Sequence, residues 1–360
     1  MTATPPRPLL SALVGDEEVE ALFSNEAELA ALLEVEAALA DAEAKAGLIG
    51  ADAAARIGEV CRNFSPDWEV LAQGLARDGV VVPELVRQLR EAVGESYRGA
   101  VHKGATSQDI VDTGLMLRLG RVAAALAQRL DALISALEKL SVRDGAVSLM
   151  AHTRMQAALA FTAAAKIETW RAPLARQAEA LHSLGPRVLV IQLGGPVGTR
   201  GSFDGKGDVV AREVAEALGL ADAPCWHSGR DRIAELAAWL SLTSGLLGKL
   251  GQDVALMAQD EIGEVEIAGA GGSSAMPHKA NPVPAEVLVA LARFNAGLLG
   301  TLNQALVHEN ERSGAAWTLE WLVLPQMAVA TAAGLATARK LVEALHIRSS
   351  SPQDAGRSSG

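Results

Sequence analysis

The densest group of reactive side chains in this sequence lies in a short stretch flanked by glycines and prolines, between two long apolar segments. Two hydroxyls, an imidazole, an ammonium and an amide fall within the nine positions from Ser273 to Asn281. Glycine opens backbone angles that other residues avoid and proline fixes them, so a loop between helices is predicted. A simple linker does not need these groups, whereas a site for a negatively charged ligand does. The candidate residues are Ser273, Ser274, Met276, Lys279 and Asn281.

A second polar cluster, at residues 97–109, ends where a long apolar helix is predicted to begin. Thr106, Ser107 and Asp109 stand where capping hydroxyls and free backbone N–H groups gather, which is a suitable site for a carboxylate. His102 precedes them in the same cluster. An ordinary helix cap is the alternative interpretation of Thr-Ser-x-Asp alone.

A third polar stretch, at residues 150–156, is predicted to open another long helix and contains His152, Arg154 and Gln156. The guanidinium of Arg154 stays protonated at neutral pH, so it cannot shuttle protons. It can bind a carboxylate through two hydrogen bonds, and we therefore expect Arg154 to hold an anion. His152 either titrates nearby or is purely structural.

Two glycine-rich segments and one charged segment complete the polar stretches. Residues 192–200 form a predicted turn before a helix. In the following segment, 201–207, the glycine spacing is one residue short of a Walker loop and no Ser or Thr follows the lysine, so nucleotide binding is not expected there. Residues 308–321 supply a further cation, Arg312, although an exposed helix end of mixed charge is the alternative. The isolated His182 and His227 are interpreted as surface or core residues.

Taken together, these motifs resemble those of the fumarase/aspartase superfamily over about residues 20–346. Gly-Ser-Ser-x-Met-Pro-x-Lys-x-Asn-Pro at 272–282 is similar to the mobile signature loop of that superfamily. His-x-Gly-x-Thr-Ser-x-Asp at 102–109 and Gly-Gly-x-x-Gly-Thr at 194–199 are similar to two further motifs. Glu-Arg-x-Gly-x-x-Trp-x-x-Glu-Trp at 311–321 resembles the 3-carboxy-cis,cis-muconate cycloisomerase branch more than the adenylosuccinate lyases.

The resemblance implies a role for each motif residue. Ser273 would be the acid/base group acting on a carbon next to a carboxylate. Lys279 and His102 would be the other catalytic residues. Thr106 and Ser107 would bind a substrate carboxylate.

At Arg154 the chain departs from the superfamily lyases, which carry a histidine there as the proposed general acid. Glu286 matches the glutamate that partners this histidine, so an Arg154–Glu286 ion pair is expected. The complete set of expected substrate-binding residues is Thr106, Ser107, Arg154, Gln156, Ser274, Met276, Asn281, Glu286 and Arg312.

The implied activity is intramolecular addition of a carboxylate across a double bond, giving a carboxymuconolactone in protocatechuate degradation. A fumarate-releasing enzyme such as adenylosuccinate lyase is the alternative, favoured by Met-Pro-His-Lys at 276–279. A non-catalytic homologue is a third possibility, but the loop keeps its serine, lysine and asparagine. The resemblance also implies no metal or organic cofactor, a small tricarboxylate substrate, and a homotetramer whose sites are shared between subunits.

The elements that must position these residues are predicted to be long helices. Apolar residues recur every three or four positions from Leu119 to Leu140 and from Ile233 to Met257, the spacing of a packed helical seam. Long helices are predicted at 115–140, 162–184, 233–257, 284–307 and 318–345, and shorter ones at 26–46, 51–63, 67–76 and 82–93. We therefore expect an all-α long-helix bundle of the superfamily type.

The expected organisation is a small helical N-terminal domain at 1–100, a central bundle at 101–346 and a disordered tail at 347–360. The resemblance further implies that the C-terminal domain is truncated. Helix formers dominate the composition, which is 49% hydrophobic but only 3% aromatic.

Charge and cysteine content restrict the partners. A net charge of −11 argues against nucleic acid or an anionic membrane as the ligand. The two cysteines, Cys61 and Cys225, are too few for a disulfide framework or a metal cluster and suit a reducing compartment. The N-terminus lacks the features of a signal peptide, and no uninterrupted apolar run reaches the length of a membrane span, so a cytoplasmic protein is expected.

Overall fold

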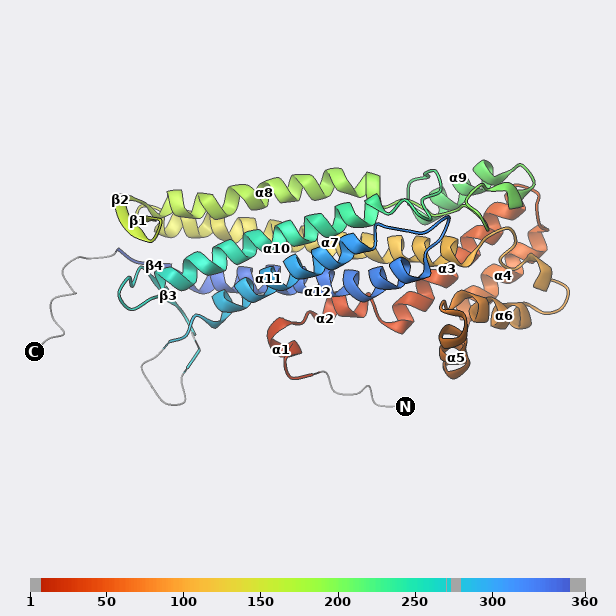
Figure 1. Cartoon of the computed structure of the whole chain (residues 1–360), viewed down its shortest axis with the longest axis horizontal. Helices are drawn as coiled ribbons and strands as arrows, with labels where there is room; N and C mark the ends of the chain where they lie inside the picture. Colours follow the sequence, from red (N-terminus) through yellow and green to blue (C-terminus); the bar gives the residue numbers. More distant parts are fainter. Residues whose placement is uncertain (1–7, 270, 273–279, 350–360) are drawn as a thin grey trace, which may run out of the picture.

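Five long helices lie side by side along the longest axis of the molecule (Figure 1). The structure, a computed structural model, describes residues 8–269, 271–272 and 280–349. The bundle helices are α7 (Ser107–Asp144), α8 (Ala163–Val188), α10 (Asp231–Met257), α11 (Val283–Gln304) and α12 (Gly314–Ala344). The predicted all-α bundle is therefore confirmed.

The apolar residues that recur every three or four positions in the sequence are the residues that the long helices bury against one another. In α7, the leucines and valine from Leu119 to Leu140 that follow the three–four spacing are all buried. Small residues bring α10 and α11 together. A Cβ added to Gly251 would lie 2.5 Å from the carbonyl oxygen of Ala285, and one on Gly248 would lie 2.5 Å from the Cβ of Ala292. Glycine is thus required for this close approach.

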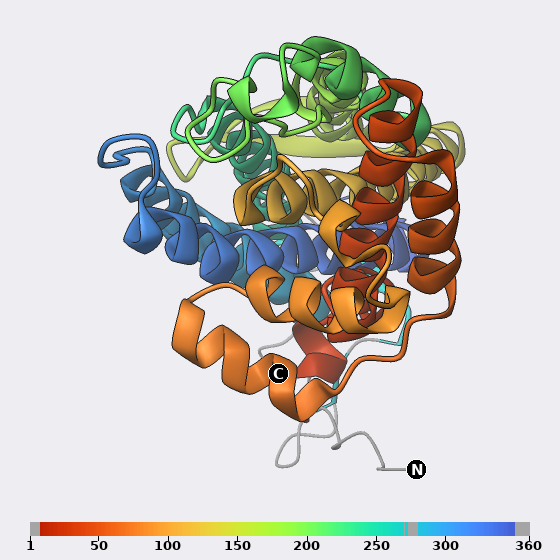
Figure 2. The ribbon, with the colours of Figure 1, turned by 90° about the vertical axis from the view of Figure 1, so that its right-hand side faces the viewer.

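Shorter helices cover one end of the bundle (Figure 2). They are α3 (Asn25–Lys45), α4 (Ala51–Asn63), α5 (Trp68–Asp78), α6 (Val82–Val93) and α9 (Gly207–Leu218), with 3₁₀ turns η1 (Arg98–Ala100) and η2 (Gly201–Phe203). The first two helices, α1 (Ser11–Val14) and α2 (Glu17–Ala21), pack along the bundle against α11 and α12. Ser24 caps α3, since its Oγ accepts the N–H of Ala27 at 3.2 Å.

The N-terminal helices share a hydrophobic core with later parts of the chain. Leu32 of α3, Ile110 of α7 and Val210 of α9 belong to one buried cluster. This cluster joins the start of α7 to the shorter helices, such as α3 and α9, that cover this end of the bundle. The domain boundary near residue 100 stays a prediction.

Residues 148–162 correct the sequence analysis, because they form a hairpin where a helix opening was expected. Strands β1 (Ser148–Thr153) and β2 (Gln156–Thr162) are antiparallel, with Thr153 opposite Gln156. The two turn residues, Arg154 and Met155, have φ values of 47° and 65°. Positive φ at both positions is the mark of a primed hairpin turn, which matches strand twist but ends any helix.

A second small ribbon closes the same end of the bundle. Strand β3 (Val265–Ile267) pairs antiparallel with β4 (Leu345–Ile347). The predicted disordered tail began at residue 347; Ile347 ends β4, and residues 350–360 lie outside the described residues.

One chain leaves part of its apolar bundle surface uncovered. By length and composition alone, α11 and α12 could each cross a membrane. The apolar window of α12 is 61% buried in the fold, but that of α11 is only 33% buried. Leu242 of α10, Phe294 of α11 and Leu322 of α12 are all exposed. These exposed apolar side chains are available for packing against another molecule.

Candidate active site

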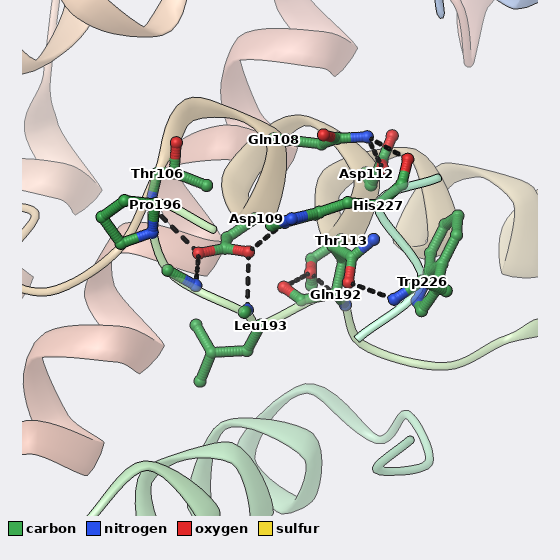
Figure 3. Close-up of polar contacts among 12 residues, drawn as sticks. Thr106, Gln108, Asp109, Asp112, Thr113, Gln192, Leu193, Pro196, Trp226 and His227 are labelled. Carbon is green, nitrogen blue, oxygen red and sulfur yellow. Dashed lines mark hydrogen bonds and ion pairs between the residues drawn. The ribbon is translucent and has the colours of Figure 1, made fainter. Parts of the chain in front are cut away.

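The start of α7 is organised around the buried carboxylate of Asp109 (Figure 3). It accepts the backbone N–H groups of Gly194 at 2.8 Å, Gly195 at 2.9 Å and Thr106 at 3.0 Å. It also lies 2.9 Å from Nε2 of His227. Asp109 therefore ties the glycine turn to the first turn of the helix and forms the helix cap that was the alternative interpretation of residues 106–109. The carboxylate-binding role of Thr106 and Ser107 stays a prediction.

His227 belongs to this arrangement, although it stands alone in the sequence. It is buried, as one of the two interpretations expected, but it is not isolated from the polar motifs. Burial lowers the pKa of His227, whereas Asp109 and Cys225 raise it, and the net result is a pKa of about 9. An Asp109–His227 ion pair follows. Sequence reasoning missed it because 118 positions separate the two residues.

Arg312 reaches the same helix start from the segment before α12. Its Nε donates to Oε1 of Gln108 at 2.8 Å, and its Nη2 donates to the carbonyl of Pro196 at 3.4 Å. Gln108 is fixed in turn, because its Nε2 donates to the carbonyl of His227 at 2.9 Å. The guanidinium is exposed, so it can also meet a ligand. The structure thus brings Arg312 to the turn of α7 that carries Thr106 and Ser107.

A buried ionic cluster lies beneath this surface. The guanidinium of Arg230 donates to Asp112 at 2.6 Å and to Glu320 at 2.5 Å, and all three side chains are almost fully buried. Trp317 donates to Asp112 at 3.0 Å, and the ring of Trp226 lies 4.6 Å from the guanidinium carbon. Burial raises the pKa of Glu320 against the opposing effect of Arg230. The Trp-x-x-Glu pattern at 317–320 is therefore a scaffold for α7, since both side chains face this cluster.

His102 is oriented by a carboxylate from α3. Its Nδ1 lies 2.7 Å from Oε1 of Glu36, which is 1% exposed, so Nδ1 carries the proton and Nε2 remains for another partner. Burial lowers the pKa of His102, but Glu36 and then Asp109 raise it more. Behind this pair, burial and Glu36 raise the pKa of Glu43 to about 8 against the effect of Lys103. His102 is thus biased toward its charged form.

The other predicted site residues that the structure describes lie at the opposite end of the bundle. Arg154 and Gln156 are exposed on the β1–β2 hairpin, and Glu286 is exposed in the first turn of α11. The described part of one chain contains no Arg154–Glu286 ion pair, so that expectation stays a prediction for a site shared between subunits. Asn281 pairs with Gly271 through two backbone hydrogen bonds, at 2.8 and 3.1 Å. Ser273, Ser274, Met276 and Lys279 lie outside the described residues.

The length of α7 separates the two groups. Its 38 residues span about 57 Å at about 1.5 Å per residue. The β1–β2 hairpin and the start of α11 lie at one end, and the start of α7 lies at the other, near α9 (Figure 1). One chain therefore brings together His102, Thr106, Ser107 and Arg312, but not the hairpin or loop residues with them.

Comparisons with known proteins agree with this architecture. A family model described as Lyase matches residues 14–294. The 3-carboxy-cis,cis-muconate cycloisomerase of Pseudomonas aeruginosa is 41% identical over 355 residues, which cover 96% of this chain and 77% of that protein. The crystal structure of 3-carboxy-cis,cis-muconate lactonizing enzyme from Pseudomonas putida superposes with a TM-score of 0.89 at 36% identity, covering 95% of this chain and 77% of the other. Nitrosuccinate lyase of Streptomyces davaonensis is 35% identical over 328 residues, 87% of this chain and 69% of that protein.

Proposed function

The chain belongs to the fumarase/aspartase superfamily of lyases, and from this premise we propose that it catalyses the cycloisomerisation of 3-carboxy-cis,cis-muconate. The observation that carries the proposal is Arg312 at the first turn of α7. Arg312 comes from the segment whose pattern distinguishes the cycloisomerase branch, and it stands at a helix start that can hold a carboxylate. The substrate is a small tricarboxylate, so it needs such anion sites.

The reaction forms a ring by adding one substrate carboxylate across a double bond, while the carbon next to another carboxylate gains a proton. The intermediate carries two negative charges on that carboxylate, in its aci form. Preorganised cations and N–H groups stabilise such charge most effectively. The N–H of Ser107 and the hydroxyls of Thr106 and Ser107, the guanidinium of Arg312 and the charged ring of His102 provide them at one end of the bundle.

The residues at the far end complete the chemistry in this proposal. Ser273 transfers the proton when its loop closes, with Lys279 and Asn281 stabilising charge. Arg154 holds a carboxylate in place of the general acid of the lyases. The acid is dispensable because a carboxylate needs no proton to leave in the reverse reaction.

The site is assembled from several subunits of a homotetramer, which we place in the cytoplasm. Two observations support a site that is shared between subunits. The two groups of site residues are separated by the length of α7, and an antiparallel second bundle would bring opposite ends together. The exposed apolar residues of α10, α11 and α12 give such a bundle a surface to pack on. The Arg154–Glu286 pair, absent within one chain, remains a proposal between subunits.

An ultraviolet assay tests the activity directly. The protein is expected to deplete the conjugated diene of 3-carboxy-cis,cis-muconate and to leave adenylosuccinate unchanged. Arg312→Ala, assayed beside Arg212→Ala in α9 as a control for loss of an arginine elsewhere, should lose activity selectively. Efficient cleavage of adenylosuccinate with no turnover of the muconate would instead establish the fumarate-releasing alternative.

A further inference from the structure

Cys225 lies beside the Asp109–His227 pair at the rim of a surface pocket. Its side chain is partly exposed, and the pocket is also lined by Thr199, Arg200 and Pro224. If a Cβ were added to Gly198, it would lie 3.1 Å from Sγ of Cys225 and 3.7 Å from Nδ1 of His227. The thiol and the imidazole therefore meet above Gly198.

The imidazole presents its unused nitrogen to this thiol. His227 is 3% exposed, Asp109 lies on its Nε2, and among the described residues its Nδ1 has no hydrogen-bond partner. A carboxylate on one ring nitrogen holds the ring in its charged form and leaves the other N–H to face a thiolate. Asp109, His227 and Cys225 have this order. Asp109 and Cys225 are also the two groups that raise the pKa of His227 against the effect of burial.

We propose that Cys225 is a reactive thiol site that exchanges with small disulfides, and that the resulting mixed disulfide lowers the activity of the adjacent site. In the exchange, the thiol releases its proton to the solvent, the protonated ring of His227 stabilises the thiolate that remains, and Sγ attacks one sulfur of the disulfide. The disulfide bond breaks, a new bond joins Sγ to the attacked sulfur, and the second sulfur leaves as a thiolate. That thiolate takes up a proton, so the net products are the mixed disulfide and one free thiol.

The position of Sγ explains why modification would affect activity. A Cβ on Gly194 would lie only 2.5 Å from Sγ, so there is no free space between the cysteine and the glycine turn. A group attached to Sγ must extend into the pocket or push this turn away from Asp109. Displacing the turn would break the two hydrogen bonds that the N–H groups of Gly194 and Gly195 donate to Asp109. These hydrogen bonds hold the turn against the start of α7.

The second cysteine provides an internal control. Cys61 is buried in α4, and burial, assisted by Glu36, raises its pKa to about 12. Thiolate is the reacting form, so Cys61 should react far more slowly than Cys225.

The native protein can be tested with 5,5′-dithiobis(2-nitrobenzoate), which is a small disulfide that releases a coloured thiolate. One thiol per chain should react fast at pH 7, at least about tenfold faster than N-acetylcysteine. The fast thiol should be lost in Cys225→Ser and kept in Cys61→Ser. His227→Asn should slow the reaction about 100-fold, because the neutral amide does not stabilise the thiolate as the charged imidazole does. Circular dichroism establishes whether this variant folds; if it does not, the comparison with N-acetylcysteine decides.

A Cys225→Ser protein that keeps its fast thiol would overturn the proposal, and so would a Cys225 rate no higher than that of N-acetylcysteine. The second part of the test, which measures turnover of the muconate, rests on the proposed function. Thiolated wild-type protein should lose turnover of the muconate and regain it with dithiothreitol, whereas Cys225→Ser should be unaffected by the same treatment. Full activity after complete thiolation would refute the regulatory part. Lack of turnover before any treatment would refute the proposed function and leave the labelling result standing.

Discussion

The separation of the two groups of site residues gives a quantitative prediction for mixed tetramers. Arg312 stands at one end of α7, and Gly271 and Asn281, which flank Ser273 in the sequence, lie at the other end, about 57 Å away along the helix. No side chain bridges that distance. If both residues serve one site, they must come from different subunits.

Two inactive variants should therefore restore each other. Ser273→Ala is expected to retain about 1% of turnover, and Arg312→Ala to lose about tenfold or more, as for a charge-assisted contact. When equal amounts are refolded together, each site receives an intact Arg312 with a chance of one half and an intact Ser273 with the same chance. About one quarter of the sites should then be intact in a randomly mixed symmetric oligomer.

The assay is the initial rate with 3-carboxy-cis,cis-muconate at saturating substrate, compared with each variant refolded alone. A second mixture, of wild type with the Ser273→Ala/Arg312→Ala double variant, is the matched control. It should also give about one quarter if the halves come from different subunits, but about one half if they come from one subunit. No recovery in the first mixture together with one half in the second would refute the shared site.

Three further predictions concern single residues. Ser273→Ala should lower turnover about 100-fold with the helical circular dichroism signal unchanged, whereas an inactive Ser274→Ala beside an active Ser273→Ala would show the serine assignment to be wrong. The pKa of His227 is raised from 6.5 to about 9, so its ion pair stabilises the fold fully below about pH 6.5 and loses this contribution as pH rises through about 9. Urea unfolding should show this loss in wild-type protein and not in His227→Asn; parallel curves for both would contradict it. Arg230→Met leaves two buried carboxylates without their cation and should cost about 3–5 kcal/mol of unfolding free energy. Arg187→Met removes an exposed pair and should cost at most about 1 kcal/mol, and equal thermal shifts for the two would count against the argument.

Local signals in the sequence predicted most of the helices. The bounds expected at 51–63 and 82–93 are those of α4 and α6, because glycine or proline marks their ends. The hairpin at 148–162 was missed because Arg154 and Met155 are not residues that usually take positive φ. The neighbouring Ala-rich segment also favours a helix when considered alone.

Contacts between distant parts of the chain account for what the site analysis missed. The helix start and Arg312 were recognisable as anion-binding groups from their own neighbours in sequence. The partners that fix the site residues in place were not recognisable from the sequence. Glu36 lies 66 positions from His102, and Asp109 lies 118 positions from His227, so only the fold brings each pair together. No periodicity or spacing rule reports such pairs.

The length of α7 has a consequence for how this enzyme can change over time. If subunits lying alongside one another bring the two halves of each site together, the length of α7 fixes the distance between the two groups of site residues within each chain. Inserting one heptad would keep the buried stripe in phase but would lengthen the helix by about 10.5 Å. The neighbouring helices α8, α10, α11 and α12 would need the same insertion to remain in register. Loops and surface residues can therefore vary singly, whereas the length of the bundle can change only through coordinated insertions in all five helices.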